Sequence, residues 1–383
     1  MADSDHQSTH SGALIGSSDD ILTEILLRLP ATSILRFKSA SKHWLWLLSD
    51  RSFTFRFDKL SKSPGLFLVG DGLLASNIYV PFDVENRTRL SFRSLDFSFD
   101  PHGIQILQSC NGLLLCCSRH FARRYYVFNP TTKQSAIIPP VPGGHETIRF
   151  MGVAFHQTDC VHYKVICIRA LDPVGESYQI QVYSSHTREW KISIQSFSVQ
   201  LSTVETWFIG RSTFRNGVFW NGAFHWFPSL KENLYFKIDV EKLQSLALPG
   251  LKKSFEYIGE SRGHLHLIVR NYRRPHSLHV NVYEMLSDHS GWFLKYELEL
   301  DELVRAFPGM INPFDYTFQV IDVVRGEKDE DTFLVLAVPS GKLISLITFN
   351  VHDSSFKEIY THPDNSFIRL PTFHRYTETL TSF

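Results

Sequence analysis

The sequence predicts a mainly β chain that carries a small helical segment near its start. Aromatic residues make up 14% of the 383 positions, a share that suits β-sheet surfaces. After position 58, short apolar or alternating runs recur at intervals of about ten residues, separated by Gly, Pro, Asn, Asp and Ser. Convincing helical periodicity is confined to residues 17–57 and to the stretch LDELVRAF at 300–307.

These changes in periodicity divide the chain into three regions. We expect residues 1–16 to form a disordered polar tail, residues 17–57 a helical domain and residues 58–383 a large β domain. The length, roughly twice that of a typical domain, agrees with one small and one large unit.

The first predicted helix begins at a capping-box pattern, Ser17 with Asp20 three residues later. One apolar stripe at helical spacing follows: Ile21, Leu22, Ile25, Leu26 and Leu29. Pro30 ends this helix because proline cannot continue the backbone hydrogen-bond ladder.

Two further short helices are predicted, one starting at Thr32 or Ser33 and one running from Ser41 to Asp50. The last of them contains five consecutive apolar residues, Trp44 to Leu48. At about 100° per residue these five go right round a helix, so one packed face can cover only part of them. A helical unit of this size also needs a neighbour to complete its core.

A weak repeat runs through residues 58–383, in which a strand ends in a polar turn and an apolar-aromatic strand follows. Five copies, taken from positions 129, 184, 239, 284 and 350, differ by 55, 55, 45 and 66 residues. Such repeats are typical of propeller blades. We therefore predict a kelch-like β-propeller of roughly six to eight blades, at about 40 to 50 residues each. The longest spacing predicts an insertion near the acidic stretch GEKDED or an undetected blade.

Charge and cysteine content exclude several classes of function. Lys+Arg and Asp+Glu are equal at 39 each. The chain therefore has no excess of positive charge that would favour nucleic acid or an anionic membrane as a partner. The five cysteines form no Cys-x-x-Cys pair, which argues against a disulfide framework and a zinc site. The N-terminus has no signal-peptide pattern and no apolar run is long enough to span a membrane. We expect a cytoplasmic and/or nuclear protein.

The sequence also offers little for catalysis or for a cofactor. It contains no Gly-x-Ser-x-Gly elbow, no P-loop and no Gly-x-Gly-x-x-Gly. His264 and His266 share one face of a predicted strand, but no third ligand follows at a suggestive spacing. We therefore predict no catalytic residue, no cofactor and no metal.

Residues 17–57 resemble the F-box motif. An amphipathic helix ends in Arg28-Leu29-Pro30, and the Ile34-Leu35-Arg36-Phe37 run follows. Then come Ser41-Lys42-His43-Trp44 and Leu47-Leu48-Ser49-Asp50, in the order and spacing of the family. The Leu-Pro pair that usually precedes the first helix is replaced by Ile15-Gly16-Ser17-Ser18, which puts the strength of adaptor docking in question.

The rest of the chain resembles the F-box-associated domain of plant F-box proteins, a β-propeller-like module. Ser109-Cys110-Asn111-Gly112-Leu113-Leu114 is similar to the family's S-x-N-G-L-L strand. Asn129-Pro130-Thr131-Thr132 is similar to its N-P-x-T turn. FHQTDCVHYKVICI, followed by QVYSSHTREW, is similar to a further strand pair, so the resemblance covers residues 109–190 well and the remainder loosely.

The resemblance implies a non-catalytic substrate receptor of an SCF-type (Skp-cullin-F-box) ubiquitin ligase. Its F-box would bind a Skp-type adaptor and through it a cullin, and its propeller would bind a protein target of unknown identity. The implied adaptor-binding residues are Leu29, Pro30, Leu35 and Trp44. The remaining apolar surface of the third helix would be shared between the adaptor and the edge of the propeller.

A second hypothesis belongs to a different class of function. The propeller would bind a carbohydrate or another small ligand, or be a degenerate enzyme, and the helical segment would be a stability cap. Trp207, Trp220 and Trp226 would then stack on sugars. This hypothesis needs convergent polar groups in one pocket, whereas the receptor hypothesis needs exposed apolar positions within residues 21–48.

Overall fold

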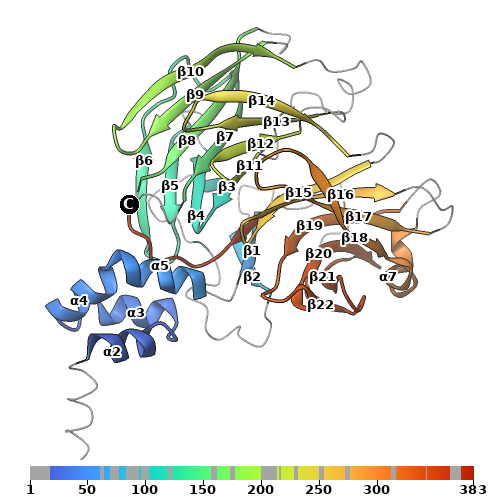
Figure 1. The fold of residues 1–383 in the computed structure, drawn as a ribbon, viewed down its shortest axis with the longest axis horizontal. Helices are drawn as coiled ribbons and strands as arrows, with labels where there is room; N and C mark the ends of the chain where they lie inside the picture. The colour runs from blue at the N-terminus through green and yellow to red at the C-terminus, as the bar shows by residue number, and fades with distance from the viewer. Residues whose placement is uncertain are drawn as a thin grey trace, which may run out of the picture.

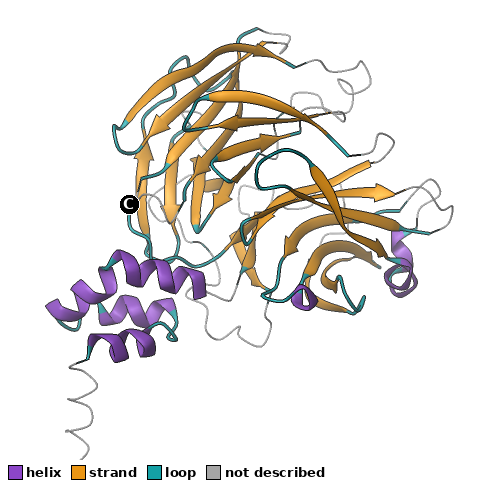
Figure 2. Ribbon diagram, viewed as in Figure 1, coloured by secondary structure: helices purple, strands orange, loops and turns teal. Residues whose placement is uncertain are grey.

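A computed structural model gives the fold of the protein. It describes residues 18–60, 64–69, 77–82, 95, 103–119, 123–156, 162–172, 177–199, 214, 217–227, 232–249, 254–271, 277–311, 316–341, 343–362 and 372–383. Within these residues, short helices at the start of the chain lie beside antiparallel sheets arranged as a ring (Figures 1 and 2). The mainly β class is confirmed: the helical unit is followed by a six-bladed β-propeller.

Five four-stranded blades follow one another along the chain, each with its strands paired in sequence order. Blade 1 comprises β3 (Ile104–Cys110), β4 (Leu113–Ser118), β5 (Tyr125–Asn129) and β6 (Gln134–Ile138). Blade 2 comprises β7 (Ile148–Ala154), β8 (Lys164–Ala170), β9 (Ser177–Ser184) and β10 (Glu189–Ser198). Blade 3 comprises β11 (Val218–Trp220), β12 (Ala223–Trp226), β13 (Glu232–Lys237) and β14 (Lys242–Ala247). Blade 4 comprises β15 (Ser254–Ser261), β16 (His264–Asn271), β17 (His279–Met285) and β18 (Trp292–Glu299). Blade 5 comprises β19 (Gln319–Val324), β20 (Phe333–Ser340), β21 (Leu343–Asn350) and β22 (Phe356–His362).

The closing blade joins strands from distant parts of the sequence. Its order is β2 (Asn77–Pro81), β1 (Gly65–Val69) and β23 (Thr372–Tyr376), all antiparallel. In β1 the Phe67 ring packs between Tyr79 of β2 and Tyr376 of β23, with centroids 5.0 and 5.1 Å away. The ring of blades is therefore closed by pairing between an early and a late strand.

The five predicted repeats are the turns that join the third and fourth strands of blades 1 to 5. Each of these turns has one non-glycine residue with a left-handed backbone, at φ values from 51° to 63°: Lys133, Arg188, Glu241, His289 and Ser354. A shared backbone geometry thus underlies the weak sequence repeat. Six blades fall within the predicted range.

The longest repeat spacing contains an insertion. Helix α7 (Asp301–Ala306), the predicted LDELVRAF segment, and the 3-10 helix η3 (Pro308–Met310) lie between β18 and β19. A second 3-10 helix, η4 (Asp329–Asp331), follows within the acidic stretch. Leu303 and Met310 are fully buried against blades 4 and 5, so the insertion extends the core of the propeller.

The core of the propeller lies between neighbouring blades. Strands β4 and β5 are buried along their whole length, whereas the outer strand β10 is mostly exposed or half-buried. The four described cysteines are buried thiols, and burial raises the pKa of Cys110 to about 12. They act as small apolar side chains in this core.

A β-bulge in the first strand of blade 1 links three blades. The register of β3 against β4 shifts between Ile106 and Gln108. The Gln108 side chain accepts a hydrogen bond from Val153 N in blade 2 (2.6 Å) and donates one to Gly217 O, next to blade 3 (3.1 Å). Similar shifts occur in the first strand pair of blades 2, 4 and 5.

The helical unit consists of α2 (Asp19–Leu26), α3 (Ala31–Phe37), α4 (Lys42–Ser49) and α5 (Arg51–Leu60). The fourth helix was not predicted, and it continues past residue 57. Asp50, the predicted end of the third helix, also begins the next one: its Oδ2 accepts hydrogen bonds from Ser52 N (2.7 Å) and Phe53 N (3.3 Å) and so caps the start of α5.

The other predicted helix boundaries agree in part. Ser41 Oγ accepts from Trp44 N at 3.1 Å, as an N-cap should. The first helix starts after Ser18, whose side chain makes no capping bond, and Ser17 lies outside the described residues. The second helix starts at Ala31, directly after Pro30. None of the helices in the described residues is long and apolar enough to cross a membrane.

Candidate functional site: the outer face of the helical unit

The helical unit has a filled apolar core to which the far end of the chain contributes. Nine core residues come from the four helices: Leu22, Leu26, Leu27, Ala31, Ile34, Leu47, Leu48, Phe53 and Phe57. The tenth is Leu380, which is 1% exposed. A residue more than 300 positions away thus supplies the neighbour that so small a helical unit needs.

Four large apolar side chains of α2 and α4 stay exposed although this core is complete. Ile21 and Ile25 of α2 are 50% and 42% exposed, and Leu45 and Trp46 of α4 are 50% and 66% exposed. We call these four residues the outer apolar face. Scattered single exposures are ordinary, but several large apolar side chains exposed within one small helical unit, a tryptophan among them, are typical of an interaction surface.

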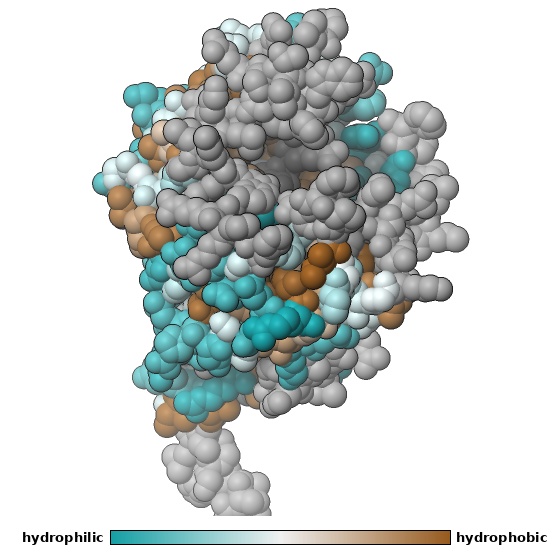
Figure 3. Space-filling model, turned by 90° about the vertical axis from the view of Figure 1, so that its right-hand side faces the viewer, coloured by the Kyte–Doolittle hydropathy of each residue, from teal (hydrophilic) through white to brown (hydrophobic). Residues whose placement is uncertain are grey.

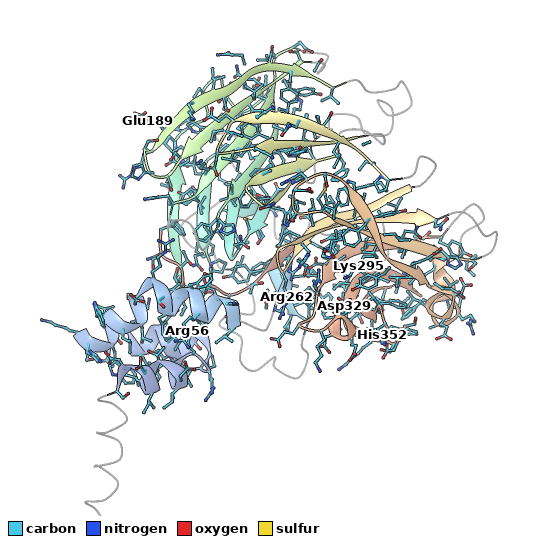
Figure 4. The ribbon with its side chains drawn as sticks, viewed as in Figure 1. Arg56, Glu189, Arg262, Lys295, Asp329 and His352 are labelled. Atoms are coloured by element: carbon cyan, nitrogen blue, oxygen red, sulfur yellow. The ribbon has the colours of Figure 1, made fainter. Side chains whose placement is uncertain are left out.

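Polar contacts hold the helices that carry this face. The His43 Nε2 atom of α4 lies 2.8 Å from Asp19 Oδ1 at the start of α2. Arg56 of α5, labelled in Figure 4, pairs with Glu24 of α2. Figure 3 shows hydrophobic residues at the lower edge of the molecule, where the helical unit lies. A surface cavity next to α4 is lined by Lys42, Leu45, Trp46, Ser49, Asp50 and Arg51.

The opposite side of the helical unit is attached to the propeller through a buried carboxylate. Asp58 of α5 is 9% exposed. Its Oδ2 accepts hydrogen bonds from Thr379 Oγ1 (2.5 Å) and Thr381 Oγ1 (3.2 Å), and its Oδ1 accepts one from Leu380 N (3.1 Å). Burial raises the pKa of Asp58 to about 6, although the three hydrogen bonds act in the other direction.

Comparison with known proteins assigns the chain to a family. The family model described as the F-box associated beta propeller domain matches residues 79–288, more than half of the chain. The F-box protein At5g07610 of Arabidopsis thaliana is 33% identical over 92% of this chain and 87% of its own length. The chain belongs to the F-box proteins that carry an F-box-associated propeller.

Other similarities are more distant. The F-box protein At5g49610 of Arabidopsis thaliana is 30% identical over 60% of this chain and 64% of its own length. Among solved structures, TolB from Acinetobacter baumannii superposes with a TM-score of 0.47 at 10% identity, covering 85% of this chain and 72% of that one.

In this F-box protein the four residues implied by the family resemblance are half-buried. Leu29, Leu35 and Trp44 pack against the helical core, and Pro30 is the N-cap of α3. The Trp44 ring makes an edge contact with Phe37, with centroids 5.1 Å apart. They lie at the margin of the core, whereas the outer apolar face is made of other residues.

Leu45 and Trp46 were not among the individually predicted residues, although both lie in the apolar run that indicated excess apolar surface. The apolar surface of the third helix was expected to be shared between the adaptor and the edge of the propeller. In the structure, Leu47 and Leu48 of α4 pack in one core with Leu380 from the end of the chain. The unpredicted helix α5 lies on the propeller side of the unit (Figure 1).

Two of the three tryptophans offered for the ligand-binding hypothesis are part of the propeller core. Trp220 and Trp226 are 5% and 1% exposed, and Trp220 Nε1 donates to Gly263 O at 2.7 Å. Trp207 lies outside the described residues. Polar groups do converge at one cavity of about 270 Å³, lined by Asn221, Gly222, Lys237, Asp239, Val240, Ser287, Asp288 and His289.

His264 and His266 both point towards the carboxylate of Glu284. His264 Nδ1 lies 2.6 Å from Glu284 Oε1, and His266 Nε2 lies 3.8 Å from Oε2. Arg325 Nη1 donates to the same Oε2 at 3.0 Å, so the carboxylate already has a cationic partner. Nearby, Lys295 Nζ lies 3.4 Å from Asp329 Oδ2 (Figure 4). In the described part of the chain, no group of three or more His, Cys, Asp or Glu is arranged to hold a metal ion.

Proposed function

We propose that this F-box protein is the substrate-recognition subunit of an SCF-type ubiquitin ligase and works in the cytoplasm and/or nucleus. A Skp-type adaptor would bind the helical unit and connect it to a cullin, and the propeller would hold the target protein. The outer apolar face supports this proposal most strongly. It stays exposed even though the core of the unit is filled, as expected of a surface that a partner covers.

The outer apolar face has the character of a helix-docking surface. Amphipathic helices bind partner grooves through apolar residues spaced three or four positions apart, as Ile21 and Ile25 are in α2. In such interfaces a tryptophan is a common energetic centre. Leu29, Pro30, Leu35 and Trp44 are proposed as the half-buried border of the same interface.

The proposed mechanism is proximity and requires no reaction on this chain. Holding a target next to a conjugating enzyme raises the effective concentration of the target lysine, and the ligase chemistry takes place on other subunits. The alternative sugar-binding function has little support, because two of its three tryptophans are buried in the propeller core.

Titration of the full chain with a plant Skp-type adaptor tests the proposal. Trp46→Ala should weaken binding tenfold or more, because interface tryptophans often contribute this much. Ile137→Ala is the matched control, since Ile137 of β6 is 68% exposed but lies on the propeller. Absence of binding by a folded wild-type chain, or equal effects of the two substitutions, would contradict the proposal.

A further inference from the structure

The last residues of the chain lie between the helical unit and blade 1. We infer that two turns of blade 1, Asn111-Gly112 and Asn129-Pro130-Thr131, form a receptor for residues 377–383, here called the terminal segment. Through this segment the helical unit is held at one orientation on the propeller. The consequence for ligase geometry rests on the proposed function, whereas the contacts themselves do not.

The Asn129 turn binds the backbone of the terminal segment directly. Asn129 Nδ2 donates to Thr379 O (3.2 Å) and to Thr381 O (2.8 Å), and Asn129 is fully buried. Its Oδ1 accepts from Thr131 N at 2.9 Å, which fixes the orientation of the side-chain amide. Thr131 Oγ1 lies 2.7 Å from the hydroxyl of Tyr376, the last residue of β23. One side chain therefore recognises two carbonyls of the segment.

The Asn111-Gly112 turn lets the segment approach closely. A Cβ atom on Gly112 would lie 2.2 Å from Thr379 Cγ2 and 2.9 Å from Thr377 O. The turn between β11 and β12 of blade 3 has the same residues, Asn221 and Gly222, and similar positive φ values. A Cβ on Gly222 would meet nothing within 4 Å. Gly112 thus needs to be glycine for a second reason besides its φ of 83°.

The other side of the terminal segment faces the helices. Asp58 accepts three hydrogen bonds from Thr379, Leu380 and Thr381, and the Leu380 side chain belongs to the helical core. Beyond it, the Phe383 ring packs edge-on against Tyr163 next to blade 2, with centroids 5.4 Å apart. The segment is therefore a layer with blade 1 on one side and α5 on the other.

These contacts give the two turn motifs a specific role. Both turns resemble motifs of the F-box-associated domain; the Asn129 turn donates hydrogen bonds to the terminal segment, and the segment lies close against Gly112 of the other turn. The side of α5 that carries Asp58 is held by the same segment. An adaptor on the outer apolar face and a target on the propeller would then be held at one relative position.

Hydrogen exchange and small-angle scattering of the full chain test the inference. Gly112→Ala should speed exchange of the Leu380 and Thr381 amides at least tenfold and increase the radius of gyration, because the segment is pushed off blade 1. Gly222→Ala adds similar backbone strain at an open turn and should leave both quantities at their wild-type values.

Asp58→Ala tests the binding of the terminal segment from the helical side. This variant keeps the inference testable if Gly112→Ala does not fold. It should also speed exchange in the terminal segment, whereas Asp58→Asn, which keeps an acceptor for Leu380 N, should change it less. Unchanged exchange and scattering in the folded variants would overturn the inference. Adaptor titration of the same variants separates this result from failure of the proposed function, because a released but folded helical unit still exposes its outer apolar face.

Discussion

Asp58 shows how a single residue can connect two structural units. Its carboxylate lies in a buried site with three hydrogen-bond donors from the terminal segment, and burial still raises its pKa to about 6 from 3.8. Desolvation therefore outweighs the hydrogen bonds. The charged form at neutral pH is tolerated because every donor in the site points at it.

Asp58 predicts a pH dependence of stability with a defined sign. Since its pKa is higher in the folded than in the unfolded chain, its favourable contribution is present below pH 3.8 and is lost as the pH rises through about 6. Between pH 5 and pH 8 the free energy of unfolding of the wild type should fall by about 1.4 kcal/mol relative to Asp58→Asn.

Urea denaturation of both proteins at the two pH values measures this difference. The comparison with Asp58→Asn cancels the contributions of buried histidines such as His266, whose pKa burial lowers to about 3 and which change stability in the opposite sense. A difference between the two proteins that does not vary with pH would contradict this account of Asp58.

At the scale of an element, helix α4 has two faces with different roles. Its inner side carries Leu47 and Leu48, which are buried, and Trp44, which packs on Phe37. Its outer side carries Leu45 and Trp46. Five consecutive apolar residues are thus divided between a folded core and an exposed surface.

The two tryptophans of α4 should respond differently to truncation. Trp44→Ala should lower the free energy of unfolding of the helical unit by about 2 to 4 kcal/mol, because it removes a large side chain that borders the core. Trp46→Ala should change it by less than about 0.5 kcal/mol, because the side chain is mostly exposed. Chemical denaturation followed by far-ultraviolet circular dichroism separates the two. Equal destabilisation would mean that Trp46 is a packing residue and would weaken its proposed role in docking.

Periodicity predicts many elements of this fold and misses others for physical reasons. The turn repeat and the LDELVRAF helix are local signals, and both are found in the structure. Helix α5 was not predicted from the sequence, because an Asp at position 50 is compatible both with the end of one helix and with the start of the next. Gln108 could not be found from sequence either, because its partners, Val153 N and Gly217 O, belong to other blades.

At the scale of the whole molecule, side-chain contacts support the ring closure that the pairing of β1 and β23 makes. Arg375 of the closing blade donates through Nη1 to Glu260 O and Val323 O, both at 3.1 Å, and lies 3.7 Å from Asp322 Oδ1. Tyr257 donates to Asp322 Oδ1 at 2.7 Å. Burial raises the pKa of Asp322, and Arg375 opposes that effect. The Arg375 guanidinium, whose side chain is 24% exposed, therefore links the closing blade to blades 4 and 5.

Removing this cation should destabilise the whole propeller. Arg375→Met should cost about 3 to 5 kcal/mol, because it leaves the buried Asp322 carboxylate without its partner. The double variant Arg375→Met/Asp322→Asn should recover at least about 1 kcal/mol of that loss, because no uncompensated charge remains. Guanidinium denaturation provides the comparison. A double variant as unstable as the sum of the single ones would show that the charge pair does not stabilise the closed ring.

The relative placement of the helical unit, the terminal segment and the propeller was the hardest feature to predict from the sequence. The family motifs predicted a helical unit and a propeller, but not that residues 377–383 lie between them. Leu380 N donates a hydrogen bond to Asp58, which lies 322 positions away in the sequence. Local sequence patterns carry no information about such distant pairs. The motif indicated which segment carries the proposed adaptor site, whereas the exposure of individual residues there depends on helix α5 and the terminal segment.

Hydrogen exchange of the full chain with and without a plant Skp-type adaptor would show which surface the adaptor covers. We expect slower exchange in residues 19–26 and 42–49, which carry the outer apolar face, and unchanged exchange in blades 3 to 5. Protection centred on the propeller, with the two helices unaffected by a saturating adaptor, would mean that the adaptor does not dock on the outer apolar face.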